Sequence, residues 1–168
     1  MLEQEQQFTT DVTVSAIAER DGRFLCIEEV TRNGVVVNLP GGHIESGESA
    51  ESAVIREVME ETRWHFTPQG FVGAYLWLDL QRSLRSIRLV FCGDVQDESQ
   101  STTLDAGILS VHWRSRDAIA ADAHRLRSPI VLTALDDFIA GRREQWQVPL
   151  DIATPELTNT ISNLSRRT

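Results

Sequence analysis

The segment from Gly42 to Trp64 constrains the fold most, because a glycine turn in it leads directly into a helix with three acids on one side. Glu57, Glu60 and Glu61 are spaced i, i+3 and i+4, so on a helix their side chains emerge within a sector of roughly 100°. The helix therefore buries one side against a sheet and turns its acids to an adjacent cleft. The buried stripe is predicted to consist of Ala50, Val54, Ile55, Val58 and Thr62.

These acids stand at the unfavourable end of the helix. If the helix runs from about Ser49 to about Thr62, Glu60 and Glu61 lie in its last turn, where the macrodipole disfavours acids by about 0.3 to 1 kcal/mol each. A bound Mg²⁺ or Mn²⁺ would reverse this cost, because hard divalent cations prefer carboxylate oxygens. A solvated acidic face is the alternative interpretation. The predicted metal ligands are Glu57, Glu60, Glu61 and the backbone carbonyl of Gly42.

The residues before the acids favour a strand, a turn and a capped helix. Leu39-Pro40-Gly41-Gly42 follows the extended run 35–37, so a strand is expected to end there. Ser49 offers a capping oxygen for the helix start. Arg56 can reach back to Glu48 or Glu60 and fix carboxylate orientation. An ordinary helix salt bridge explains Arg56 equally well.

The order of these residues resembles the Nudix box, G-x5-E-x7-R-E-U-x-E-E-x-G-U, in which U is a bulky apolar residue. The matching positions are Gly42, Glu48, Arg56, Glu57, Val58, Glu60, Glu61 and Trp64. Arg63 departs from the pattern, because it stands where the family has glycine. A residue with a Cβ is less stable by about 1 kcal/mol at a positive φ, so we expect this departure to affect the turn more than the chemistry.

The resemblance implies a Nudix-type α/β/α sandwich around a mixed β-sheet and a metal-dependent hydrolase. Residues 11–149 further resemble the NudJ-type phosphatase subgroup, which acts on thiamine-pathway pyrophosphates and nucleoside phosphates. The acid that many relatives carry just before Ile108 is absent, since Gly107 stands there and Asp105 is nearby. The short matches to the subgroup are Val12-Thr13-Val14, Asn38-x-Pro40-x-Gly42-His43, Arg88, Trp113 and Leu126-Arg127-Ser128-Pro129.

Alternation and turn signals independently predict an α/β fold. Strands are expected over 12–18, 24–28, 35–38, 71–80, 86–95 and 108–114, and further helices over 117–123 and 130–140. Pro129 suits the first position of the last helix, and Gly141 suits its end. Strands mixed with three helices imply an α/β/α sandwich. We expect a flexible end over 1–8, one domain over 9–150 and a polar tail over 151–168.

Charge and composition limit the partners. The formal charge of −9 repels nucleic acid, membrane surfaces and free nucleotides, so binding of a pyrophosphate is expected to depend on metal. All 16 basic residues are arginines, which excludes a Schiff-base lysine or a phosphate-loop lysine. Cys26 and Cys92 are expected to be buried thiols. Because no apolar stretch reaches membrane-spanning length and residues 1–7 lack the features of a secretion signal, a cytoplasmic location is expected.

Four residues are candidates for substrate binding. Arg85 and Arg88 lie in or near a strand that should border the cleft, where an arginine can clamp a phosphate; surface salt bridges are the alternative. Trp77 can stack a flat ring, although packing in the core is commoner. His43 is adjacent to Gly42 and either points into the site or makes a backbone hydrogen bond.

The sequence therefore predicts a Mg²⁺- or Mn²⁺-dependent pyrophosphohydrolase. Glu57 is the first candidate for the general base, Arg56 orients it, and Glu60 is the second candidate. The substrate is a nucleoside di- or triphosphate or a thiamine-pathway pyrophosphate. ADP-ribose, a dinucleoside polyphosphate, a non-catalytic nucleotide sensor and a Ca²⁺-stabilised structural helix are the alternatives. The chain is expected to be a monomer or a homodimer, with Trp146 as a candidate interface residue.

Overall fold

The computed structural model describes residues 9–80, 83–97 and 103–144. Within these residues, the chain forms six strands, three α-helices and a short 3-10 turn. The strands are β1 Thr9–Arg20, β2 Arg23–Thr31, β3 Gly34–Asn38, β4 Trp64–Asp79, β5 Leu84–Asp97 and β6 Ile108–Ser115. The helices are α1 Ala50–Thr62, α2 Arg116–Ala121 and α3 Ile130–Ile139, with the 3-10 turn η1 at Ala123–Arg125.

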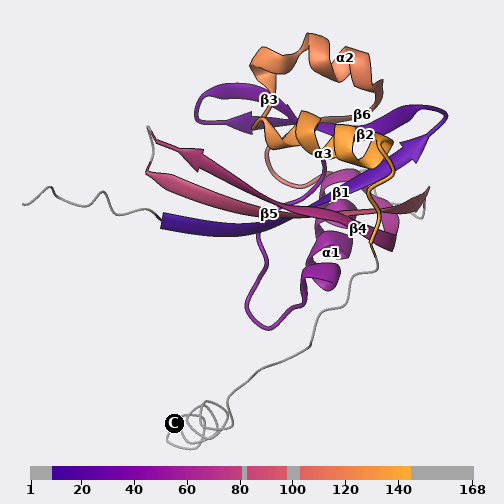
Figure 1. The fold of residues 1–168 in the computed structure, drawn as a ribbon, viewed down its shortest axis with the longest axis horizontal. Helices are drawn as coiled ribbons and strands as arrows, with labels where there is room; N and C mark the ends of the chain where they lie inside the picture. Colours follow the sequence, from indigo (N-terminus) through magenta and orange to yellow (C-terminus); the bar gives the residue numbers. More distant parts are fainter. Residues whose placement is uncertain (1–8, 81–82, 98–102, 145–168) are drawn as a thin grey trace, which may run out of the picture.

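The strands form a mixed sheet in the order β3-β2-β1-β5-β4, with β6 paired to β2 (Figure 1). The long strand β1 lies parallel to β5, and the other pairings are antiparallel. The predicted hairpin at 20–22 exists, but β1 and β2 pair only at Glu19 with Phe24 and Arg20 with Arg23. The rest of β1, from Thr9 to Ala18, pairs with β5 instead of β2, so the sheet is open between β1 and β2.

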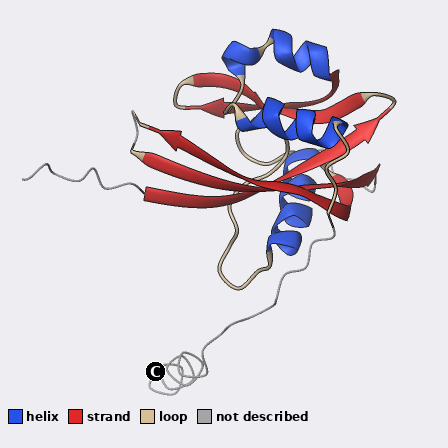
Figure 2. Cartoon of the chain, viewed as in Figure 1, coloured by secondary structure: helices blue, strands red, loops and turns tan. Residues whose placement is uncertain are grey.

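Helices cover both faces of the sheet, as Figure 2 shows. α1 packs on one face over a cluster that includes Val14, Ala16 and Phe91. α2 and α3 cover the other face over a second cluster that includes Ile17 and Val90. Residues 13–18 of β1 are buried on both faces, as expected for a strand between two layers. The predicted α/β/α sandwich is therefore confirmed.

The helix that carries the acids begins and ends where the sequence predicts. The Ser49 side chain caps its start by accepting a hydrogen bond from the Ser52 backbone N–H at 3.1 Å. At its end Arg63 adopts the left-handed conformation, with φ 64° and ψ 18°, and its N–H donates to the Met59 carbonyl at 3.0 Å. Arg63 thus takes the conformation that a glycine would take here, and the helix ends in an αL cap.

Some boundaries differ from the predicted ones. β4 begins at Trp64, seven residues before the predicted start at residue 71. Two irregularities, between Pro68 and Gly70 and between Phe71 and Gly73, interrupt the alternation of its side chains, so the sequence pattern does not indicate the first part of the strand. β4 is an edge strand over most of its length, where a proline is tolerated. The predicted flexible end, the polar tail and Trp146 lie outside the described residues. Cys26 and Cys92 are both buried, as predicted.

Among the helices that the structure describes, none has both the length and the apolar composition that a membrane span requires.

Candidate active site

A cleft of about 440 Å³ gathers residues from distant parts of the chain. The helix α1 and the glycine turn before it form one side of the cleft. Strands β1, β2, β3 and β5, together with residues 105–108 and 127, form the other side. All three predicted metal ligands from α1 line this cleft, which is the arrangement expected from their helical spacing.

The glycine turn at Gly41 and Gly42 fits closely around the acids. The Gly41 N–H donates to Glu61 Oε2 at 2.8 Å. A Cβ on Gly42 would lie 2.5 Å from Glu57 Oε1, so the missing side chain leaves room for that carboxylate. The Gly42 carbonyl, a predicted metal ligand, accepts a hydrogen bond from the Val14 N–H at 2.8 Å. A carbonyl oxygen has two lone pairs, so this bond leaves one for a cation.

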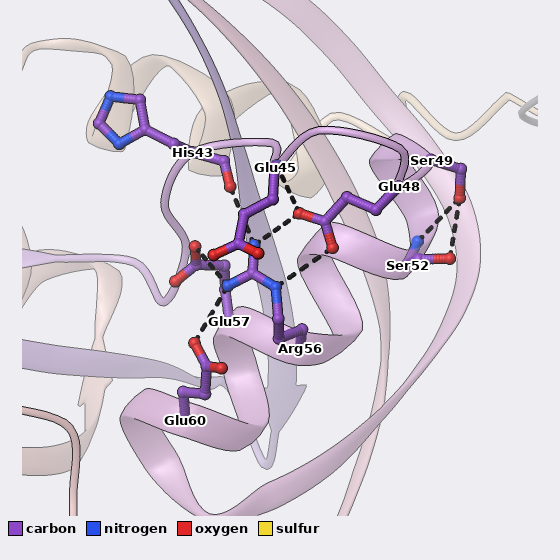
Figure 3. A network of polar contacts seen from close by, with 8 residues as sticks. All are labelled: His43, Glu45, Glu48, Ser49, Ser52, Arg56, Glu57 and Glu60. Atoms are coloured by element: carbon purple, nitrogen blue, oxygen red, sulfur yellow. Dashed lines mark hydrogen bonds and ion pairs between the residues drawn. The ribbon is translucent and has the colours of Figure 1, made fainter. Parts of the chain in front are cut away.

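Arg56 binds three glutamates and the glycine turn at once (Figure 3). Its Nε and Nη2 groups donate to the two Glu48 oxygens at 3.1 and 2.6 Å. Its Nη1 group donates to Glu57 Oε1 and to Glu60 Oε2, each at 3.0 Å. Its Nη2 group also donates to the His43 carbonyl at 3.0 Å. The predicted reach of Arg56 to Glu48 and Glu60 is therefore confirmed, and this guanidinium fixes the orientation of the carboxylates.

The carboxylates in the cleft differ strongly in their electrostatic surroundings. Burial, together with the nearby carboxylates of Glu57, Glu29 and Asp105, raises the pKa of Glu61 to about 8, against the hydrogen bond from Gly41. Burial also raises the pKa of Glu57, although Arg56 opposes the shift. The hydrogen bonds from Arg56 hold the pKa of Glu48 below its ordinary value. Burial therefore dominates at Glu57 and Glu61, and the positive charge of Arg56 offsets it only in part at Glu57.

The donor set fits a hard divalent cation. Carboxylate oxygens are the ligands that Mg²⁺ and Mn²⁺ prefer, and Glu57 and Glu61 are buried acids that a cation would stabilise in the charged form. Within the part of the chain that the structure describes, no three acidic, histidine or cysteine side chains form an assembled metal-binding group. Arg56 donates hydrogen bonds to Glu57 and Glu60, and the Gly41 N–H donates one to Glu61.

The structure separates the predicted substrate-binding residues into two groups. Arg88 and His43 line the cleft. The imidazole of His43 is 70% exposed, lies 3.7 Å from Asp11 and turns away from the carboxylates in Figure 3. Arg85 is exposed outside the cleft lining, and Trp77 packs against the core cluster on the α3 side.

Sequence reasoning gave no site role to several cleft residues. Glu29 enters the cleft at a register shift in β2, and Asn38 at the end of β3 is 3% exposed. Asp105 lines the cleft, and its N–H donates to the Glu60 carbonyl at 3.0 Å. Arg127, which belongs to the short subgroup match 126–129, also lines it. The sequence did mark Asn38 and Arg127, through the short subgroup matches that contain them. Those matches do not indicate that the two residues lie close together in the folded chain.

Comparison with known proteins agrees with this geometry. A model of the NUDIX domain matches residues 9–135. Phosphatase NudJ of Escherichia coli (strain K12) is 29% identical over 148 residues, which cover 88% of this chain and 95% of the relative. A NUDIX hydrolase from Nitrosomonas europaea has a TM-score of 0.79 and 35% identity, covering 83% of this chain and 97% of that one. The MutT NUDIX hydrolase from Burkholderia pseudomallei shares the fold, with a TM-score of 0.64, 22% identity, and coverage of 77% of this chain and 98% of that one. Since the family model spans the whole cleft, and Gly42, Arg56, Glu57, Glu60 and Glu61 of the box line it, this chain belongs to the Nudix hydrolase family.

Proposed function

We propose that this chain is a Mg²⁺- or Mn²⁺-dependent hydrolase of the phosphoanhydride bond in a nucleoside di- or triphosphate or a thiamine-pathway pyrophosphate. The observation that carries the proposal is that Glu57, Glu60 and Glu61 share one cleft with the buried Arg88. Acids suited to a cation and a guanidinium suited to a phosphate are the two parts that such a substrate needs. The similarity to Phosphatase NudJ and to solved Nudix hydrolases supports the same activity.

The proposed cation ligands are Glu57, Glu60, Glu61 and the Gly42 carbonyl. When bound, Mg²⁺ or Mn²⁺ neutralises charge on the diphosphate and lowers the pKa of an attacking water. With a net charge of −9, the chain repels a free diphosphate, so this neutralisation favours binding of the phosphates beside the acids of α1. His43, Arg85 and Trp77 remain substrate-binding predictions, and only His43 and Arg88 line the cleft.

Residues of α1 take the proton from the attacking water and position the carboxylates. Glu57 takes the proton from the attacking water, with Glu60 as the second candidate for this role. Arg56 positions both carboxylates, since one of its nitrogens donates to each at 3.0 Å. The water oxygen forms a bond to phosphorus, and the bond between that phosphorus and the bridging oxygen breaks. Two phosphate products and one proton leave the site.

The substrate is a small molecule, which matches the volume of the cleft. The enzyme works in the cytoplasm as a monomer or homodimer, without nucleic acid or membrane. An ADP-ribose or dinucleoside polyphosphate substrate, a non-catalytic nucleotide sensor and a Ca²⁺-stabilised structural helix are the competing functions.

A product-release screen tests the proposal. The purified chain is incubated with ATP, ADP, thiamine pyrophosphate, ADP-ribose and diadenosine tetraphosphate, with Mg²⁺, with Ca²⁺ or with chelator. We expect hydrolysis with Mg²⁺ and none with chelator. Nucleotide binding without hydrolysis would identify a sensor. Uptake of Ca²⁺ at least as tight as that of Mg²⁺, again without hydrolysis, would identify a structural cation site.

A further inference from the structure

Among the residues that the structure describes, the buried guanidinium of Arg88 has only neutral hydrogen-bond partners. Its side chain lies in the cleft and the residue is 8% exposed. Nη1 donates to Asn38 Oδ1 at 3.2 Å, and Nε donates to Thr13 Oγ1 at 3.4 Å. Of the carboxylates that the structure describes, none lies within ion-pair distance of Arg88, although Arg56, Arg114 and Arg116 each form at least one ion pair. A buried guanidinium held this way has positive charge to offer to a ligand.

A second arginine lies in the same cleft. The Arg127 backbone N–H donates to the Val37 carbonyl at 3.0 Å, which fixes this residue beside β3 at the cleft. Its Nε lies 3.7 Å from Glu29 Oε1, and its side chain is 41% exposed. Glu29 in turn accepts a hydrogen bond from Asn38 Nδ2 at 3.0 Å. Asn38 thus connects the two arginines, because its oxygen binds Arg88 and its nitrogen binds the carboxylate beside Arg127.

The two arginines repel each other in the free chain. Burial and the positive charge of Arg127 together lower the pKa of Arg88 to about 10, against attraction from Glu29 and Glu61. Two guanidinium groups in one cleft, with one carboxylate, that of Glu29, beside Arg127, suit a ligand that carries more than one negative charge. The acids of α1 line the same cleft, so the ligand can extend from one group to the other.

We propose that Arg88 and Arg127 together bind the free terminal phosphate of the substrate, so that the site selects phosphoanhydrides with an uncapped end. The proposal rests on the proposed function of this cleft. A terminal phosphate carries about −1.5 to −2 charge near neutral pH and three acceptor oxygens, which two guanidinium groups can match. A diphosphate esterified at both ends carries about one charge on each phosphate. Glu29 and Asn38 are positioning residues, because they hold the arginines and need not touch the phosphate.

A matched pair of substrates tests the proposal. ADP and ADP-ribose share adenosine and the diphosphate, and differ in whether the distal phosphate is capped. We expect Arg127→Gln to lower kcat/KM for ADP by roughly 10- to 100-fold, mainly through KM, because a charge-assisted contact is lost. The rate with ADP-ribose should change by less than about threefold, since only screened long-range attraction is lost. Arg88→Met should show the same selectivity, and Arg127→Gln decides the question if Arg88→Met does not fold.

Arg125→Gln is the matched control. Arg125 is two residues away and 35% exposed, but it binds Glu28 at 2.9 Å and lies outside the cleft lining. Its replacement removes the same charge and should leave both substrates unaffected. An equal loss with ADP and ADP-ribose in Arg127→Gln would overturn the proposal, because the arginine would then contact the shared diphosphate. Unchanged kinetics with both substrates would overturn it as well.

A second measurement separates this proposal from the proposed function. In chelator, inorganic phosphate should raise the Tm of the wild-type chain and of Arg125→Gln, but not that of Arg127→Gln. This protection depends on the arginines alone and needs neither metal nor turnover. Protection without hydrolysis of any diphosphate would refute the proposed function and keep the phosphate site. Hydrolysis of diphosphates with equal protection of Arg127→Gln would refute the phosphate site and keep the proposed function.

Discussion

The conformation of Arg63 makes a quantitative prediction about the end of α1. Arg63 has φ 64°, in the left-handed region where a residue with a Cβ is strained. Its side chain also donates from Nε to the Thr103 carbonyl. Replacement by glycine removes the strain and this hydrogen bond together, whereas replacement by alanine removes only the hydrogen bond. The difference in the free energy of unfolding between Arg63→Gly and Arg63→Ala therefore measures the strain of a residue with a Cβ in the left-handed conformation.

We expect Arg63→Gly to be more stable than Arg63→Ala by about 1 kcal/mol in the free energy of unfolding. In a chain of 168 residues this difference corresponds to a Tm difference of roughly 2 to 4 °C. Urea denaturation followed by circular dichroism measures the first quantity, and thermal denaturation measures the second. Equal stability of the two variants, or a more stable alanine variant, would refute the argument, because the left-handed cap would then carry no strain.

Two further predictions concern the cleft. Gly42→Ala should lower turnover about 10- to 100-fold with little loss of stability, because a methyl group there would lie 2.5 Å from Glu57 Oε1 and displace a carboxylate from its position; wild-type turnover in this variant would contradict the role of the turn. Glu61 has a folded-state pKa of about 8, above its ordinary value of 4.5, so the stability that it contributes is fully present below about pH 4.5 and is lost as the pH rises through about 8. As the pH rises from 5 to 8.5, the metal-free wild type should therefore lose free energy of unfolding relative to Glu61→Gln. The loss should be roughly 1.4 kcal/mol for each pH unit between the ordinary pKa and the folded-state pKa. Denaturation curves with the same pH dependence for both proteins would contradict this pKa.

Local features of the site were predictable because their causes are local. The hydroxyl of Ser49 caps α1 because a serine before an apolar stripe has little competition for that role. The i, i+3, i+4 spacing brings Glu57, Glu60 and Glu61 to one side of a helix whatever the helix packs against. The contact from Arg56 to Glu60 spans one turn of the same helix, so it too follows from sequence.

The rest of the cleft depends on long-range pairing. Arg88 and Asn38 are 50 residues apart, and they meet because β5 and β3 belong to one sheet. Arg127 reaches the cleft through a backbone bond to Val37, which no periodicity in the sequence indicates. Residues 85 and 88 are an odd number of positions apart, so their side chains face opposite sides of β5. Arg88 lines the cleft and Arg85 does not, and the substrate-binding role of Arg85 stays a prediction.

The most direct test of the central claim is calorimetric titration of Mg²⁺ or Mn²⁺ into the chain with a diphosphate present, together with turnover of the same samples. We predict that the wild type binds the cation, and that Glu60→Gln and Glu61→Gln each lower turnover at least about 100-fold while the fold stays intact. No cation uptake by the wild type, or near-wild-type rates in both variants at saturating Mg²⁺, would contradict the account of α1 as the metal-binding helix.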